Sequence, residues 1–323
     1  MSRTRLPVVI LLLASVVCAG PLWAGGETEE PLSLTGATFA GTSGMGIIRL
    51  FEDTPDLGKG VGLRMIVLPS PVDMAAKVAS GEVDFAVFPS NVGAKLYTKG
   101  PGYVLGAVTG LGTFALLTRN PAIERWEDLQ GRKVYSTGMG ATPDFLFRYF
   151  TEQHGVDVQA DFSYNKAPQL AQMAIGKKVD TVILPEPFVS MVLRGAPDMR
   201  IALDFQETWK DIYDTDSIYP VTIITVRPGL AEQRPGVVQA FLAAYRESVD
   251  WVNENPEEAG VLIEKYGILK ADVAAAAIPK SNLTFIAAGE ARESLEHFLK
   301  VLLDYDPASL GGALPDAGFY FEE

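Results

Sequence analysis

Cysteine and histidine are nearly absent from the 323-residue chain, which holds one cysteine, Cys18, and two histidines, His154 and His297. If the chain is cut after Ala24, no cysteine remains, and disulfides, thiolate catalysis and cysteine-based metal sites are excluded together. Two histidines leave few candidates for general-base catalysis by the commonest side chain. His154 precedes Gly155 at a predicted helix end and His297 lies inside a helical stretch, so we interpret both as structural. We therefore expect no catalytic residue, no metal and no cofactor.

Positive charge is outnumbered, since 27 Lys and Arg residues stand against 40 Asp and Glu residues and the formal net charge is −13. This balance argues against nucleic acid or polyphosphate partners held by non-specific attraction. The motifs GxxxxGK[ST], HExxH and GxSxG are missing, and the glycines at 41–46 are spaced GxxGxG, the reverse of a dinucleotide fingerprint. Asp211, Asp214 and Asp216 lack the spacing of a calcium loop, so we interpret them as a solvated surface.

Long apolar runs are also missing. Arg3 and Arg5 precede an apolar stretch at 6–17, which is shorter than the about 20 residues needed to span a bilayer. This pattern predicts a signal peptide over residues 1–24. A second reading makes Cys18 a lipidation site, and both stay open. Either way we expect export to the periplasm or to the outer face of the cytoplasmic membrane.

Alternating strand and helix patterns fill the rest of the chain. We predict strands over Leu32–Ala40, Leu63–Leu68 and Val83–Phe88, with helices over Gly44–Glu52 and from Pro71 onward. A βαβαβ series of this kind favours a parallel sheet.

A unit of about 50 residues occurs twice. TSGMG at 42–46 is followed 94 residues later by STGMG at 136–140, and MAAKVASGEVDFAVFP at 74–89 is matched by LAQMAIGKKVDTVILP at 170–185. In the longer pair, Gly81 matches Gly176, Asp84 matches Asp180 and Pro89 matches Pro185. We interpret this as duplication, with convergent α/β sequence patterns as the alternative.

Each of the two short glycine turns follows a predicted strand and begins a helical pattern. There it presents backbone N–H groups, hydroxyls and the positive end of a helix dipole, without a bulky side chain. In parallel sheets, ligands bind outside the carboxyl ends of the strands. Two such turns, one from each half and facing each other, predict a cleft for a small polar solute.

Other strand ends extend the predicted site. The repeat makes Ser90 and Glu186 equivalent, so one half offers a hydroxyl and the other a carboxylate suited to an amine or amide. The alternative for Glu186 is a charge that only complements a helix dipole. Tyr219, at a predicted return crossing, is a candidate for stacking on a planar ligand, with core packing as its alternative. The full predicted set is Thr42, Ser43, Gly44, Met45, Ser90, Asn91, Gly112, Gly140, Ala141, Thr142, Glu186 and Tyr219.

Four stretches together resemble a known family. They are GTSGMGIIRLFE at 41–52, GEVDFAVFPSNVGAKLYTKG at 81–100, GATPDFLFRY at 140–149 and LPEPF at 184–188. They are similar to the extracytoplasmic solute-binding proteins of ABC importers in the nitrate/taurine/alkanesulfonate group, relatives of the thiamine-pyrimidine-precursor binding proteins.

The resemblance implies an α/β, two-lobed periplasmic-binding-protein fold of type II with two crossing strands. Lobe 1 would combine residues 25–110 and 221–323, and lobe 2 would be 111–220. Positions matching the family's binding turns are Thr42, Ser43, Gly44, Ser90, Asn91, Gly140, Ala141, Thr142 and Glu186. The implied partners are a small-molecule ligand and an ABC permease, and we expect a monomer.

The ligand is open at this stage. None of the predicted turns contains Arg or Lys, which favours a neutral or zwitterionic organic solute, including a planar heterocycle, over nitrate or a sulfonate. The alternatives are enzymes of the same fold, namely pyrimidine synthases and menaquinone-pathway dehydratases, or a ligand sensor for a membrane receptor. The synthases would carry a cysteine-rich motif that this chain lacks, and both enzyme types work without an export signal.

Overall fold

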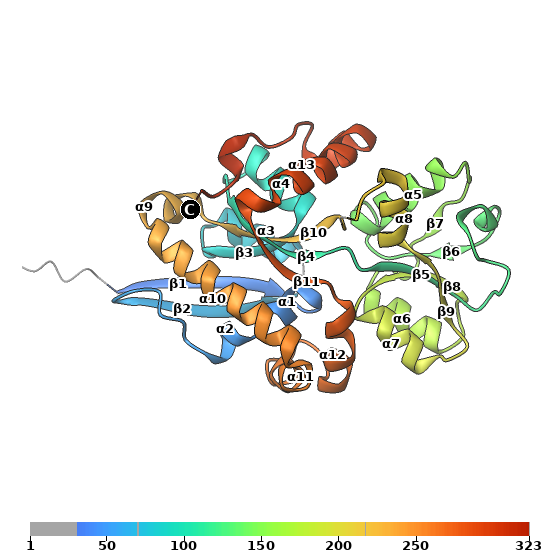
Figure 1. The fold of residues 1–323 in the computed structure, drawn as a ribbon, viewed down its shortest axis with the longest axis horizontal. Coiled ribbons are helices and arrows are strands. Elements are labelled where there is room, and N and C mark those ends of the chain that lie inside the picture. Colours follow the sequence, from blue (N-terminus) through green and yellow to red (C-terminus); the bar gives the residue numbers. More distant parts are fainter. Residues whose placement is uncertain (1–30, 70, 217, 323) are drawn as a thin grey trace, which may run out of the picture. The chain divides into compact units, whose positions relative to one another are not determined.

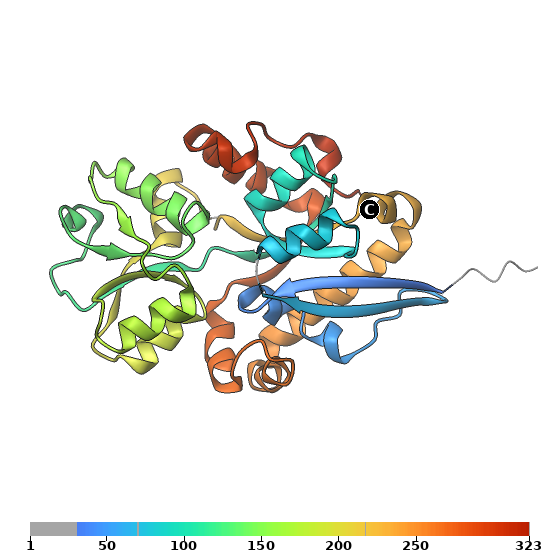
Figure 2. The ribbon, with the colours of Figure 1, turned by 180° about the vertical axis from the view of Figure 1, so that it is seen from behind.

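The computed structural model describes residues 31–69, 71–216 and 218–322, and the predicted signal peptide and Cys18 lie outside them. The described chain is an α/β unit with two separate sheets, seen from opposite sides in Figures 1 and 2. This confirms the expected fold class. None of the helices in these ranges combines the length and apolar character needed to cross a membrane.

The first sheet has six strands in the order β11-β4-β10-β3-β1-β2. Its strands are β1 Leu32–Phe39, β2 Val61–Leu68, β3 Phe85–Pro89, β4 Val104–Leu111, β10 Pro220–Val226 and β11 Leu283–Ala287. Strand β1 pairs in parallel with both β2 and β3, as the βαβαβ pattern predicts. Strand β10 runs antiparallel between β3 and β4, so the sheet is mixed.

The second sheet has five strands in the order β7-β6-β8-β5-β9. They are β5 Phe114–Thr118, β6 Val134–Tyr135, β7 Ala160–Asp161, β8 Thr181–Pro185 and β9 Arg200–Asp204. Strand β8 is parallel to β6 and antiparallel to β5, so β8 and β5 repeat the relation between β3 and β10.

Helices cover both sheets. Around the first sheet lie α1 Thr42–Gly46, α2 Arg49–Glu52, α3 Pro71–Ala79, α4 Ser90–Lys99, α9 Pro228–Gln233, α10 Pro235–Glu254, α11 Pro256–Lys265, α12 Ala271–Ala277 and α13 Ala288–Tyr305. With the second sheet are α5 Thr142–Gln153, α6 Ala167–Ile175, α7 Phe188–Gly195 and α8 Phe205–Tyr213. Short 3₁₀ turns are η1 Trp126–Leu129, η2 Ile278–Lys280, η3 Pro307–Leu310 and η4 Ala317–Phe319. The predicted helix over 44–52 is therefore two short helices.

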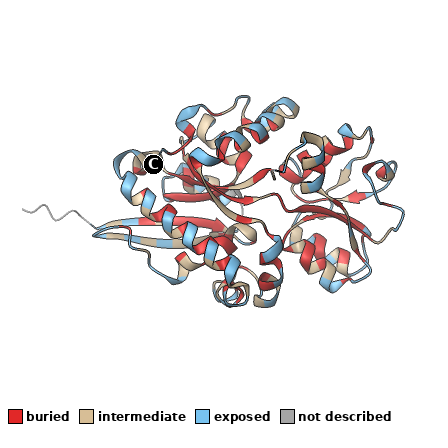
Figure 3. Ribbon diagram, in the orientation of Figure 1, coloured by how far each residue is buried: buried red, intermediate tan, exposed pale blue. Residues whose placement is uncertain are grey.

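The central strands of the first sheet, β3, β4 and β10, are largely buried on both faces (Figure 3). On β3, Phe85 and Val87 face the core that includes α10, while Ala86 and Phe88 face the opposite core. The ring of Phe85 stacks on Phe241 of α10 with a centroid distance of 3.6 Å. Burial of alternate side chains on two faces explains why the sequence of β3 is almost continuously apolar.

The repeat in the sequence is a repeat in the structure, with two corrections. After α3, the N–H of Gly81 bonds to the carbonyl of Val78, and after α6 the N–H of Lys177 bonds to Ala174. The left-handed position is Gly81 in the first copy, with φ 73°, and Lys177 in the second, with φ 56°. The predicted match of Gly81 to Gly176 is therefore wrong by one residue, because Gly176 has φ −75° and still lies at the helix end.

The second correction concerns the two short glycine motifs. TSGMG at 42–46 forms helix α1 itself, capped by Gly41, whereas STGMG at 136–140 is a loop before α5, which is capped by Ala141. Both pentapeptides follow the equivalent strand of their sheet, β1 and β6, but the first is helical and the second is a loop. They lie 94 residues apart (136 minus 42), whereas β3 and β8 begin 96 residues apart (181 minus 85).

The aspartates of the two Val-Asp pairs make the same backbone hydrogen bond, in which the aspartate carbonyl accepts the N–H of an arginine. The carbonyl of Asp84 accepts the N–H of Arg227 beyond β10, and the carbonyl of Asp180 accepts the N–H of Arg119 beyond β5. The Asp84 carboxylate is also buried, receiving the N–H of Thr35 at 2.8 Å and the Arg227 Nε at 2.8 Å. Asp84 thus connects β1, β3 and β10 through one side chain.

The chain passes between the sheets twice at one place. Gly112 follows β4, and its N–H donates to the carbonyl of Tyr219, just before β10, at 2.9 Å. Asn282 Nδ2 donates to the carbonyl of Gly112 at 2.8 Å. A Cβ at Gly112 would lie 2.2 Å from atoms of the Tyr219 ring, so the crossing requires a residue without a side chain.

We predict that Gly112→Ala lowers the free energy of unfolding by about 1–3 kcal/mol, because the added methyl group overpacks the crossing. Urea denaturation measures the change. The control is Gly289→Ala in α13, where a Cβ meets no atom within 4 Å and is expected to be neutral or stabilising. Wild-type stability of Gly112→Ala would show that the crossing is not tightly packed.

The repeat supplies a matched pair for a second prediction. Asp84→Asn is expected to cost about 1.5–3 kcal/mol, because it removes a buried charged partner of Arg227 and Thr35. Asp180→Asn, whose side chain is 73% exposed and lies 3.5 Å from Arg119, is expected to cost less than about 1 kcal/mol. Equal losses in urea denaturation would contradict the structural role given to Asp84.

Candidate functional site

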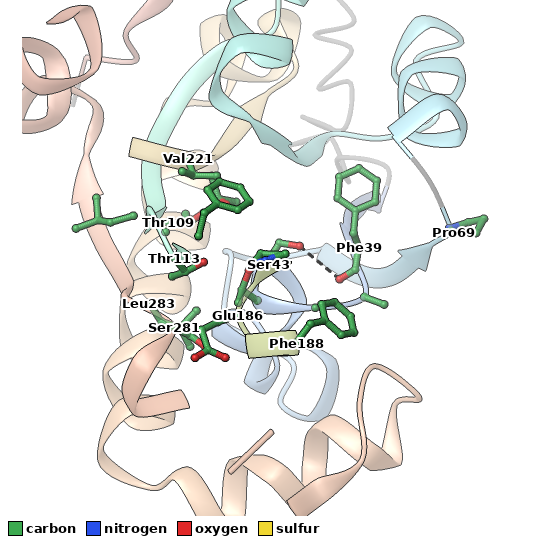
Figure 4. A pocket seen from close by; sticks show the side chains of 18 residues that line it. Phe39, Ser43, Pro69, Thr109, Thr113, Glu186, Phe188, Val221, Ser281 and Leu283 are labelled. Carbon is green, nitrogen blue, oxygen red and sulfur yellow. Dashed lines mark hydrogen bonds between the residues drawn. The ribbon is translucent and has the colours of Figure 1, made fainter. Parts of the chain in front are cut away.

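A cavity of about 360 Å³ lies beside the crossing and is lined by residues of both sheets (Figure 4). The first sheet contributes the ends of β1 and β4 and the starts of β10 and β11, and the second contributes the start of β5 and the end of β8. Three phenyl rings line it, from Phe39, Phe114 and Phe188, and the hydroxyl-bearing lining residues are Thr42, Ser43, Thr109, Thr113, Thr222 and Ser281. Glu186 is the one carboxylate of the described lining, which holds no Lys or Arg.

The first glycine turn reaches this cavity through two of its residues. Gly41 has φ 108°, a conformation that favours glycine, and it caps α1 so that Thr42 and Ser43 line the cavity. Gly44 and Met45 are buried behind them, and a Cβ at Gly44 would lie 2.5 Å from the Phe39 carbonyl oxygen. The predicted members of this turn therefore divide into two that line the cavity and two that pack the core.

Glu186 comes to the cavity from the carboxyl end of β8. It is 6% exposed, and both carboxylate oxygens are held by one residue: Oε2 accepts the N–H of Ser190 at 3.1 Å and Oε1 accepts the Ser190 hydroxyl at 3.0 Å. Burial raises the pKa of Glu186 above its ordinary value of 4.5, while the two Ser190 hydrogen bonds and the charge of Lys280 oppose that rise. The cavity thus contains a desolvated acid.

Ser90 is the equivalent of Glu186 in the first copy and is used differently. It is fully buried, and its hydroxyl donates to the carbonyl of Pro220 at 2.8 Å, which ties β3 and α4 to the start of β10. Asn91 is buried beside it, and its Oδ1 has no hydrogen-bond partner among the described residues. Neither Ser90 nor Asn91 is part of the cavity lining.

The second glycine turn does not line the cavity. The N–H of Met139 donates to Asn165 Oδ1 at 3.1 Å and the N–H of Gly140 donates to Asp144 Oδ2 at 2.8 Å, so these two amides already have partners. Ala141 caps α5, and Thr142 is buried with an Oγ1 that finds no partner within the described chain. Gly140, Ala141 and Thr142 lie outside the lining.

Gly112 and Tyr219 meet each other at the crossing instead of facing the cavity. The Tyr219 hydroxyl donates to Gln206 Oε1 at 2.8 Å, and burial raises the pKa of Tyr219 well above its usual range. Tyr219 lines a second space of about 550 Å³ with Trp209, Glu290, Glu293 and His297. The described residues include no group of three or more His, Cys, Asp or Glu side chains arranged to hold a metal ion.

The sequence interpretation missed several lining residues. Phe39 is the last residue of β1 and Phe114 is the first residue of β5, so their positions at strand termini were a usable signal. Ser281 and Leu283 come from far along the chain, and they reach the cavity because β11 pairs with β4. That pairing has no local sequence signal.

The two-sheet architecture is that of the periplasmic binding proteins, whose solved structures this chain resembles along most of its length. The chain belongs to the NMT1/THI5-like family, whose model matches residues 58–259. The resemblance inferred from the sequence stretches is therefore confirmed. No curated protein matches the chain in sequence.

Three solved structures illustrate the similarity. An ABC transporter protein of Parabacteroides distasonis is 26% identical, with a TM-score of 0.79 over 91% of this chain and 100% of that one. The periplasmic aliphatic sulphonate-binding protein SsuA of Escherichia coli is 17% identical, with a TM-score of 0.70 over 91% and 93% of the two chains. The periplasmic nitrate-binding protein NrtA of Synechocystis is 17% identical, with a TM-score of 0.56 over 76% and 69%.

Glu186→Gln is predicted to stabilise the ligand-free protein at neutral pH. The pKa of Glu186 is raised in the folded state, so the stability linked to its proton is present at low pH and is lost as pH rises through the raised pKa. Glutamine mimics the protonated acid, so the advantage of the variant should grow between about pH 4 and pH 7.

Urea denaturation at the two pH values measures this difference. Glu293→Gln, at an exposed glutamate of the second space, is the control and should behave like the wild type at both. If Glu186→Gln were less stable than the wild type at pH 7, the carboxylate would be a net stabilising group, contrary to its burial.

Proposed function

We propose that this protein is the extracytoplasmic solute-binding component of an ABC importer. It captures a small polar organic ligand between its two sheets and delivers it to a membrane permease. The observation that carries this proposal is the cavity at the crossing. Thr42 and Ser43, which follow β1 of the first sheet, line this cavity together with Glu186, which follows β8 of the second sheet. Membership in the NMT1/THI5-like family supports it.

The proposed mechanism is a ligand-driven shift between open and closed forms of two lobes, 25–110 with 221–323 and 111–220. A ligand that touches both lobes favours the closed form, because it binds that form more tightly than the open one. The buried oxygens of Asn91 and Thr142, which lie outside the cavity lining and have no partner among the described residues, are candidates for hydrogen bonds that exist only in the closed form.

The proposal includes binding without catalysis. It also includes export and the other expectations from the sequence that follow here. Export is supported by the likeness to SsuA and NrtA, which are periplasmic proteins. Removal of residues 1–24, the alternative of a lipid at Cys18, and a monomeric state are expectations from the sequence. The sensor alternative shares the same ligand capture and differs in the membrane protein that it contacts.

A thermal-shift panel of amines, amino acids, pyrimidines, purines, sulfonates and nitrate tests this function. A true ligand at a hundredfold excess over its dissociation constant should add about 2.7 kcal/mol to the free energy of unfolding. For any hit, Thr42→Ala and Glu186→Ala are each predicted to weaken affinity by about tenfold, because each removes a hydrogen-bonding group of the cavity.

Glu293→Ala, in the second space, is the matched control and should leave the affinity unchanged. Unchanged affinity in both cavity variants, with a loss in Glu293→Ala, would move the binding site to the second space.

A further inference from the structure

The carboxylate of Glu186 is held on both of its oxygens by a single neighbouring residue. Ser190 donates its backbone N–H to Oε2 and its hydroxyl to Oε1, so each oxygen receives one hydrogen bond. A carboxylate oxygen has two lone-pair directions, so each keeps one that Ser190 does not use. Ser190 is itself buried, on the first turn of α7, and does not line the cavity.

The charges around Glu186 are few. Lys280, at the end of η2, is the charged group that acts on it, and Lys280 is exposed. Arg194, further along α7, is paired with Asp272 of α12 at 2.9 Å. The rest of the described lining is apolar or hydroxyl-bearing. A buried carboxylate in such surroundings favours a partner that brings its own positive charge or several N–H donors.

The other walls of the cavity carry phenyl rings as well as hydroxyl groups. Phe39 and Phe188 stand on one side of the labelled group in Figure 4, and Glu186, Thr113 and Ser281 stand on the other. A ligand with a planar ring and an adjoining amine can meet both kinds of wall at once.

We propose that Ser190 is a positioning residue that keeps Glu186 ionised and oriented, and that the cavity therefore selects flat-ringed solutes carrying an ammonium, amidine or amino group and rejects anions. This inference rests on the proposed function and names the ligand class of the same site. Ser190 acts through Glu186 and is not itself expected to touch the ligand.

Three probes that share one ring and differ in charge test the selectivity. They are benzylamine, benzyl alcohol and benzenesulfonate, each titrated against the full chain by ligand-observed NMR. At pH 7 benzylamine should bind at least tenfold more tightly than benzenesulfonate, and Glu186→Gln should abolish the preference. Stronger binding of benzenesulfonate, or no binding of benzylamine, would overturn the ligand class.

The pH profile of benzylamine binding tests Ser190. Affinity should fall as pH drops through the raised pKa of Glu186, because protonation removes the charge that binds the amine. Ser190→Ala removes one hydrogen bond to the carboxylate, so the midpoint of the affinity profile should move to higher pH, with the loss of affinity largest on the acidic side of that midpoint. Ser190→Thr keeps a hydroxyl and should restore the midpoint. An equal loss at every pH would mean a merely structural role and would overturn the proposal.

Failure of this inference is separable from failure of the proposed function. If a panel compound binds in a way that depends on Thr42 while benzylamine does not bind, the solute-binding function stands and the ligand class is wrong. If no solute binding depends on Thr42 or Glu186, the function fails as well.

Discussion

The backbone of Gly112 lies directly against the ring of Tyr219, and this contact fixes where the two passages between the sheets meet. The N–H of Gly112 bonds to the carbonyl of Tyr219 at 2.9 Å, with no space for a side chain. Thr113 and Phe114 follow Gly112, and Val221 follows Tyr219 by two positions; all three line the cavity. The crossing thus sets the position of the cavity, because the residues that follow Gly112 and Tyr219 in the chain form part of the cavity lining.

The same helix–turn–strand unit occurs once with each sheet, and the two copies carry different side chains where the strand ends. Both copies end a helix with the same left-handed turn, at Gly81 and Lys177, and both anchor the next strand through an aspartate carbonyl and an arginine amide. They differ where the strand ends. Ser90 uses its hydroxyl to bond the carbonyl of Pro220, whereas Glu186 keeps lone pairs beyond its bonds to Ser190. One strand end therefore ties β3 and α4 to β10, and the other places a carboxylate in the lining of the cavity.

Features governed by local sequence were predictable. Periodicity indicated the parallel strands and the duplicated helix–turn–strand unit. Positions at strand ends indicated three residues of the cavity lining, Thr42, Ser43 and Glu186. The two pentapeptides follow equivalent strands and still differ in conformation, because helix caps depend on the residues around each motif. Ser281 and Leu283 escaped prediction since only the pairing of β11 with β4 brings them to the cavity.

A crystal structure of the protein with benzylamine, or with a solute that co-purifies with it, tests the central claim most directly. The account predicts density for the solute beside the crossing, with a nitrogen within hydrogen-bonding distance of the Glu186 carboxylate and a ring near Phe39 or Phe188. Density in the space bounded by Trp209 and His297, with an empty cavity at Glu186, would contradict it.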